Sequence, residues 1–176
     1  MGDKLIREQG YNGFSFTDIS KVLGIRNASI HYYFPTKTDL GIAVVKRQHE
    51  ELNQIVRNSA KSDPVKQLSR FMDMYNTLHN DGQVCIVGSL ATDLNTIEKP
   101  VRKELKFLAD DILLWMKTIL EEGKKQGIFH YKISSRAKAL LIISNIMAAL
   151  QLSRITDPGD FDLIRNSIIK ELKTGS

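Results

Sequence analysis

The chain has 176 residues, of which 42% are apolar and 26% are charged; this is a globular composition and excludes disordered and collagen-like classes. Cys85 is the single cysteine, which excludes an intrachain disulfide and indicates a reducing compartment. The charged N-terminus lacks a signal-peptide core, and the uncharged stretch at residues 139–153 is shorter than the roughly 20 residues of a membrane span. We therefore expect a cytoplasmic protein with no membrane partner. Its net charge of +5 permits an anionic partner without demonstrating one.

The first fifty residues predict short helices separated by turns. We expect three short helices before Thr36 and a longer helix over residues 37–59. The short N-terminal module passes directly into this longer helix, so we place the domain boundary there. The expected division is a small helical domain at residues 1–46 and a larger helical domain at residues 47–176.

Five larger helices are expected in the rest of the chain. Asp63-Pro64 offers a cap and a proline at the first helical position, followed by apolar residues at steps of three and four. Pro100 opens another such helix, which should run until Gly123 to Gly127 stops it. The last two are expected at about residues 135–155 and 160–173. Since no sustained two-residue alternation occurs, the sequence predicts an all-α fold of about nine helices.

The residues from Ser15 to Phe34 form the most informative motif. Ser15 and Asp18 have the spacing of a capping box, which predicts the start of a short helix. Gly24 stands where that helix must end, because glycine adopts the left-handed conformation without a Cβ penalty. A second short helix follows, with Ile30 and Phe34 on its buried side. Two helices joined by a tight glycine turn are a helix-turn-helix, so residues 1–46 are predicted to be a helix-turn-helix DNA-binding domain.

The second helix of the motif offers a surface that suits DNA. No acidic residue occurs from Asn27 to Thr38, so the helix can approach phosphate without repulsion, and its hydroxyls and ring edges can contact phosphates or base edges. Lys37 begins the next helix, where a nearby phosphate would face both the helix N-terminus and the ammonium. Asn27 and His31 are expected nearest to bases. The candidate DNA-binding residues are Ser15, Thr17, Arg26, Asn27, Ala28, Ser29, His31, Tyr32, Tyr33, Thr36 and Lys37. Alternatively, Tyr32 and Tyr33 cover the small core, and Lys37 is a solvated surface lysine.

At this point the sequence resembles a family. The pattern Gly10-Tyr11, Ser15, Asp18-Ile19, Gly24-Ile25, Ile30, Tyr32-Tyr33-Phe34 and Lys37-x-x-Leu40 is similar to the N-terminal pattern of TetR/AcrR-type transcriptional regulators. The match covers about residues 10–46. The resemblance implies an all-helical, dimeric, ligand-responsive DNA-binding regulator, usually a repressor. Its partner would be double-stranded DNA carrying a palindromic operator.

Several positions depart from the family pattern. Arg26 stands where the family often has a capping serine, Asn27 where lysine is common, and His31 where tyrosine is usual. These departures leave the DNA-binding inference intact and bear on the operator sequence. Family members also usually have several more helical residues before Asp3, so the resemblance implies a first helix that is short or trimmed.

The helix expected at residues 135–155 is apolar on more faces than one core can use. We expect its outer face to pack on a second copy, together with the apolar stripe of the last helix, as a four-helix homodimer interface. The candidate interface residues are Ile142, Ile146, Leu150, Phe161, Ile164, Ile168 and Leu172. A homodimer would set two helix-turn-helix motifs on a dyad, as a palindromic operator requires.

The larger domain exceeds what is needed to hold two small DNA-binding modules together. We therefore expect a hydrophobic or amphipathic small-molecule effector, bound between the helix at residues 37–59 and those starting at Pro64 and Pro100. The candidate ligand-binding residues are Phe71, Met72, Tyr75, His79, Phe107, Trp115 and Met116, each of which could equally be ordinary core. The alternative function is a helical DNA-binding or scaffolding protein without an effector.

Catalytic and metal chemistry have little support in the sequence. No phosphate loop, dinucleotide fingerprint, nucleophile elbow or zinc-protease motif occurs, and the histidines form no spaced ligand set. We expect no enzyme activity, no metal and no cofactor. Cys85 is interpreted as a small core residue, with a reactive thiol sensor as the alternative.

Overall fold

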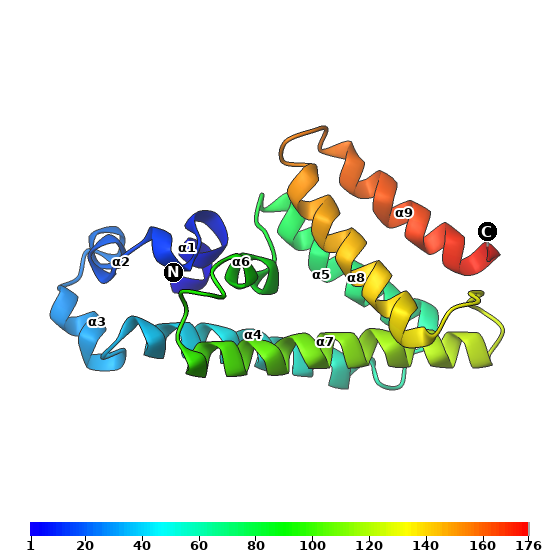
Figure 1. Ribbon diagram of the computed structural model, residues 1–176, viewed down its shortest axis with the longest axis horizontal. Helices are drawn as coiled ribbons and strands as arrows, with labels where there is room; N and C mark the ends of the chain where they lie inside the picture. The colour runs from blue at the N-terminus through cyan, green and yellow to red at the C-terminus, as the bar shows by residue number, and fades with distance from the viewer. Residues whose placement is uncertain (176) are drawn as a thin grey trace. The chain divides into compact units, whose positions relative to one another are not determined.

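The computed structural model of the chain describes residues 1–175 and is shown in Figure 1. Within these residues the chain forms nine α-helices, one short 3-10 turn (η1) and no strand, which confirms the predicted all-α fold. The elements are α1 (Gly2–Gln9), η1 (Tyr11–Gly13), α2 (Phe16–Leu23), α3 (Asn27–Tyr33), α4 (Lys37–Ser59), α5 (Pro64–Asn80), α6 (Ile86–Thr92), α7 (Lys99–Lys125), α8 (Ser135–Leu152) and α9 (Gly159–Thr174).

Helix boundaries follow the local signals with small differences. Asp63 caps α5 by accepting from the backbone N–H of Lys66 at 2.9 Å, as the Asp-Pro pair predicts. Helix α7 continues through Gly123 and ends at Lys125, before Gly127 adopts a positive φ of 69°. The helix at α8 ends at Leu152 rather than near residue 155. Helix α6 has seven residues and no distinct start or stop signal in the sequence. It is therefore shorter than expected, since all five helices after residue 59 were expected to be larger.

The chain divides into two compact units. The first unit comprises Met1–Glu51 with Cys85–Ala109, and the second comprises Leu52–Val84 with the residues from Asp110 onward. Helices α4 and α7 therefore each contribute residues to both units. The first unit also contains α6 and the start of α7, which the sequence analysis assigned to the C-terminal domain.

In the first unit, α1 packs against η1 and α6. The Ser89 hydroxyl of α6 donates to the carbonyl oxygen of Ile6 at 2.6 Å in a buried contact. Asp93, just after α6, accepts from the backbone N–H of Tyr11 at 2.7 Å. The core of this unit includes the fully buried side chains of Ile6, Val45, Leu90 and Val101. Because these side chains come from α1, α4, α6 and α7, the hydrophobic core of the unit needs both of its chain segments.

In the second unit, α8 lies beside both α9 and α5. The Lys138 ammonium, buried at the start of α8, pairs with the Glu171 carboxylate of α9 at 2.6 Å. His79 of α5 stacks on the Phe161 ring with centroids 4.5 Å apart. These contacts close a core of large side chains, of which Phe71, Met116, Ile146, Phe161 and Leu172 are fully buried. No helix in the described part of the chain is both long enough and apolar enough to span a membrane.

Candidate nucleic-acid interface and ligand cavity

The helix-turn-helix forms as the local signals predict. The Asp18 carboxylate accepts from both the backbone N–H and the hydroxyl of Ser15, each at 2.7 Å, and these hydrogen bonds hold the pKa of Asp18 below its usual range. Gly24 ends α2 in the left-handed conformation, with φ 65° and ψ 29°. Helix α3 then begins at Asn27 and buries Ile30. The turn is thus fixed by a cap on one side and a glycine on the other, which presents α3 as an exposed helix.

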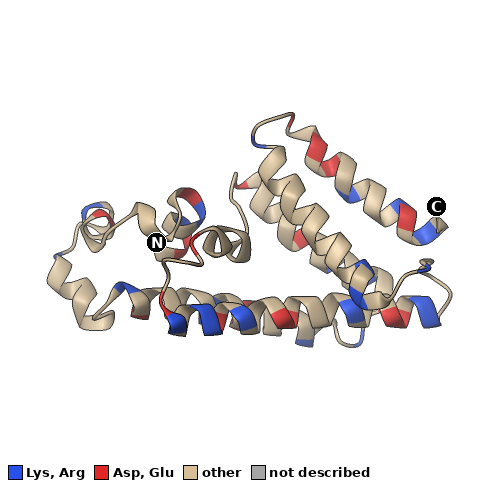
Figure 2. Ribbon diagram, in the orientation of Figure 1, with Lys and Arg blue, Asp and Glu red and all other residues tan. Residues whose placement is uncertain are grey.

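The predicted DNA-binding residues lie on this exposed side of the first unit. All eleven are exposed except Asn27 and Lys37, which are half-buried. Tyr32 and Tyr33 are 82% and 74% exposed, so neither covers the small core. Helix α3 carries no lysine, arginine or acidic residue along its length (Figure 2), which leaves its hydroxyl, amide and imidazole groups as the polar features of this surface.

The two residues expected nearest to bases, Asn27 and His31, also make contacts inside the motif. The Asn27 amide donates to the Thr17 hydroxyl at 2.9 Å, which links α3 to α2. The His31 ring lies edge-on to Phe16 with centroids 4.8 Å apart, and its Nδ1 lies 3.3 Å from the Pro35 carbonyl oxygen. If Nδ1 carries the proton for that contact, Nε2 remains as an acceptor for a base edge.

Lys37 differs from the solvated lysine considered above. Its ammonium donates to the backbone carbonyl of Phe14 and lies 4.3 Å from the centroid of the Phe14 ring. It also lies 5.1 Å from the Tyr11 ring, and partial burial lowers its pKa. The start of α4 is fixed by a second capping box, in which Asp39 accepts from the backbone N–H of Thr36 at 2.9 Å. Lys37 therefore ties α4 to the segment before α2.

We expect Lys37→Ala to weaken binding to all DNA sequences alike. If the ammonium neutralises one phosphate, the slope of log affinity against log salt should fall by about 0.9. A binding titration on one specific and one unrelated duplex, repeated at several salt concentrations, measures this. Were the slope unchanged while the melting temperature dropped, Lys37 would serve only to hold the Phe14 segment.

The predicted ligand-binding residues fall into three groups. Phe71, Tyr75 and Trp115 form one aromatic cluster, in which the Phe71 centroid lies 5.1 Å from Tyr75 and 5.8 Å from Trp115. Met72 and Met116 are buried in the second unit, where His79 stacks on Phe161. Phe107 is 46% exposed and belongs to the first unit, whereas the aromatic cluster belongs to the second.

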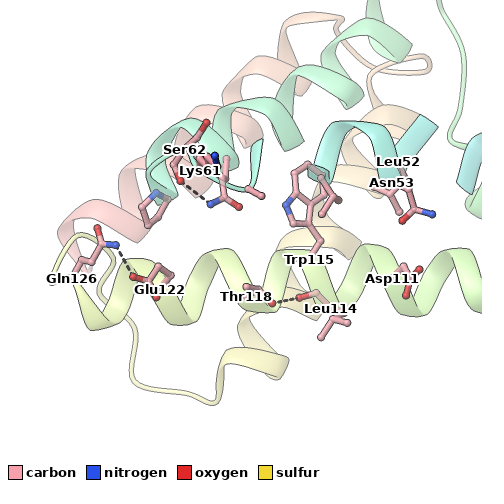
Figure 3. A pocket seen from close by; sticks show the side chains of 14 residues that line it. Leu52, Asn53, Lys61, Ser62, Asp111, Leu114, Trp115, Thr118, Glu122 and Gln126 are labelled. Atoms are coloured by element: carbon pink, nitrogen blue, oxygen red, sulfur yellow. Dashed lines mark hydrogen bonds between the residues drawn. The ribbon is translucent and has the colours of Figure 1, made fainter. Parts of the chain in front are cut away.

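The second unit contains a cavity of about 620 Å³ whose lining side chains are drawn in Figure 3. It lies between the end of α4, the turn after it, the start of α5 and the C-terminal half of α7. The lining residues are Leu52, Asn53, Val56, Ala60, Lys61, Ser62, Pro64, Gln67, Asp111, Leu114, Trp115, Thr118, Glu122 and Gln126. These helices are the three between which an effector was expected. Of the seven residues predicted to bind ligand, however, Trp115 is the one that lines this cavity.

Most of this lining could not be predicted from the sequence, because aromatic and thioether side chains were the signal for a ligand site and few of the lining residues are of these types. On α7 the lining residues Asp111, Trp115, Thr118 and Glu122 recur at helical spacing and share one face. A mixed polar and apolar face of this kind is indistinguishable in sequence from an ordinary solvent-facing stripe. In the described part of the chain, no group of three or more histidine, cysteine or acidic side chains is placed to hold a metal ion.

The structure corrects the residues expected at the dimer interface. Ile142, Ile146, Leu150, Phe161, Ile168 and Leu172 are buried within the subunit, and Ile164 alone of the seven is exposed, at 38%. The apolar faces predicted to meet a second copy instead lie in the core of their own subunit, where α8 packs against α5 and α9. The exposed apolar side chains of these two helices are Leu140, Leu141, Leu152, Leu163 and Ile164.

Residues 2–44 match the family model described as bacterial regulatory proteins, tetR family. A protein of Lactococcus lactis described as an uncharacterized HTH-type transcriptional regulator is 28% identical, over 96% of this chain and 89% of its own length. A TetR-family transcriptional regulator from Agrobacterium tumefaciens has a similar crystal structure, with a TM-score of 0.88 and 29% identity over 98% of this chain and 93% of its own. The crystal structure of a TetR transcriptional regulator from Legionella pneumophila is also similar, with a TM-score of 0.86 and 27% identity over 98% of this chain and 93% of its own.

Proposed function

Because this chain belongs to the TetR family of transcriptional regulators, we propose that it is a repressor that binds a palindromic operator as a homodimer and is released by a small apolar or amphipathic effector. The observation that carries the proposal is the capped helix-turn-helix with its exposed, acid-free α3. Tyr32 and Tyr33 are 82% and 74% exposed on this helix, and their rings lie edge to face with centroids 5.1 Å apart.

Selection of bound sequences from random duplex DNA tests the DNA-binding part of the proposal. We expect an inverted repeat whose half-sites lie about one helical turn, roughly 34–36 Å, apart. Enrichment of a single unrepeated site, or of none, would contradict binding as a symmetric dimer. Substituting Tyr32 should change the enriched half-site or abolish enrichment without lowering thermal stability, because this side chain is 82% exposed.

The homodimer is proposed to form through the exposed faces of α8 and α9. Leu140, Leu141 and Leu152 point away from the subunit core, together with Ser144 and Ala148 between them. No charged residue occurs on α8 after Lys138, as the tan stretch of this helix shows in Figure 2. An exposed uncharged face of this length suits burial against its own symmetry copy.

Effector control is proposed to act through α4. The cavity is lined by Leu52, Asn53 and Val56 of this helix, and the same helix continues back to Lys37 beside the DNA-binding motif. A ligand that fits the cavity better in one position of α4 than in another shifts the population of DNA-competent dimers. Typical coupling of about 1–3 kcal/mol is sufficient.

Thermodynamic reciprocity tests this coupling. If a ligand is found that lowers operator affinity, saturating operator must lower the affinity for that ligand by the same factor. Calorimetric titration of the ligand into the free protein and into the operator complex measures the two ligand affinities. Equal ligand affinity in the two titrations would show that the cavity is not linked to DNA. It would then favour the alternative of a DNA-binding protein without an effector.

A further inference from the structure

The strongest unexplained feature of the second unit is the indole N–H of Trp115. Trp115 is 5% exposed, and its Nε1 is buried without a hydrogen-bond partner among the described residues. Buried donors are nearly always paired, because an unsatisfied donor loses its hydration and gains nothing in return. The ring is packed against Phe71 on the core side and lines the cavity on the other. In the view of Figure 3, the edge that carries the nitrogen faces the side of the cavity where Lys61 and Ser62 lie.

Other polar side chains of the cavity wall already have partners. The Thr118 hydroxyl donates to the Leu114 carbonyl at 2.9 Å, and the Gln67 amide donates to the Ser62 carbonyl at 2.9 Å. The Gln126 amide donates to the Glu122 carboxylate at 2.7 Å. The wall therefore satisfies these groups internally, while Trp115 Nε1 has no partner among the described residues and Trp115 lines a cavity large enough for a small molecule.

The charges around Trp115 restrict what the acceptor can be. Asp111 and Glu122 lie four and seven residues away on the same face of α7, about 6 and 10 Å along the helix axis. Lys61 is the single basic residue of the lining, and its side chain is exposed. An anionic acceptor at Trp115 would be repelled by both carboxylates. A neutral oxygen avoids this repulsion and still accepts the hydrogen bond.

We propose that this cavity selects a small amphiphile with an uncharged carbonyl oxygen, which accepts the hydrogen bond of Trp115 Nε1 while its hydrocarbon part lies along Leu52, Val56 and Leu114. This inference rests on the proposed effector function, since it names the chemistry of the ligand at that site. It gives Trp115 the role of a specificity-determining contact, in addition to its packing against Phe71.

Three probes with the same ten-carbon tail test the proposal on the full-length protein. Decanamide offers a neutral carbonyl, decanoate an anionic acceptor, and protonated decylamine no acceptor at all. Trp115 is the only tryptophan in the chain, so its fluorescence reports on this site directly. We expect decanamide to bind about tenfold more tightly than decanoate and to shift the emission. Decanoate binding as tightly as decanamide, or no binding of decanamide, would overturn the proposal.

Trp115→Phe removes the donor and keeps an aromatic ring against Phe71. By calorimetry, we expect it to weaken decanamide binding about tenfold and to leave decylamine binding within twofold. Thr77→Val is the matched control, because its hydroxyl donates to the Asp73 carbonyl at 3.0 Å and Thr77 does not line the cavity; we expect no change in decanamide affinity. Unchanged decanamide affinity in Trp115→Phe would refute the role of Nε1. If this variant does not fold, the wild-type emission shift decides, since it must occur with decanamide and not with decylamine.

Operator release is measured separately. If decanamide binds through Trp115 but leaves operator affinity unchanged, the ligand chemistry stands and effector control fails. If decanamide releases DNA equally from wild type and Trp115→Phe, effector control stands and the role of Trp115 fails.

Discussion

Replacing Leu141 with glutamate is expected to convert the protein to a monomer and to lower operator affinity by about a hundredfold or more. Leu141 is 51% exposed on the uncharged face of α8 that we propose as the dimer interface. A carboxylate there must be desolvated on association and meets its symmetry-related copy across the dyad, which is strongly unfavourable. A monomer then engages one half-site and loses the roughly 10²–10⁴-fold gain of simultaneous binding. Sedimentation at micromolar concentration and an operator titration measure the two effects.

Leu94→Glu is the matched control, because this leucine is 43% exposed and belongs to the first unit, not to the proposed interface on α8 and α9. It should leave the sedimentation coefficient unchanged. Ile146→Glu should behave differently from both, since Ile146 is fully buried and a charge there should unfold the second unit. A monomeric wild type, or a dimeric Leu141→Glu variant with full operator affinity, would contradict the proposed interface.

Gly123→Ala is expected to lower the free energy of unfolding by about 2–3 kcal/mol and the melting temperature by about 5–10 °C. Helix propensity alone predicts the opposite, since alanine is favoured over glycine inside a helix by about 1 kcal/mol. The packing decides the sign: a Cβ at Gly123 would lie 2.0 Å from Cδ2 and 2.8 Å from Cγ of Phe129. Phe129 is 1% exposed, so its ring has little room to move away. Thermal unfolding measures the loss.

The clash can be isolated by a double-mutant cycle. Phe129→Leu replaces the ring with a smaller side chain. Gly123→Ala should therefore lower the free energy of unfolding by less in that background than in the wild type. Lys125→Ala, on an exposed position of the same helical turn, should change stability by less than about 0.5 kcal/mol. A Gly123→Ala variant as stable as the wild type would show that Phe129 packs elsewhere.

The helix-turn-helix could be predicted from sequence because its determinants are local. The Ser15 and Asp18 box and the left-handed Gly24 act within a few residues of the elements that they fix, so their spacing specifies the turn directly. The exposure of α3 follows in turn, since Ile30 buries one side and the polar residues take the other.

Features that depend on which helices meet could not be predicted in the same way. Helix α8 is apolar on most of its faces, so its sequence does not show which face enters the core. The structure turns Ile142 and Ile146 inward and Leu140 and Leu141 outward. The unsatisfied Trp115 donor is likewise invisible in sequence, because any nearby carbonyl could have accepted its hydrogen bond. Such features emerge only when segments distant in sequence are packed together.

The attachment of α1 to α6 has a consequence for how regulators of this kind can be recombined. The segment that carries the DNA-binding motif is completed by residues more than seventy positions away, through the contacts of Ser89 with Ile6 and of Asp93 with Tyr11. In a chimera joined at residue 46, Leu90 and Val101 would be replaced by residues of another protein. The buried side chains of Ile6 and Val45 would then face an apolar surface that does not match them. Operator specificity should therefore be transplantable only by surface substitutions on α2 and α3, or by grafting both segments of the first unit together.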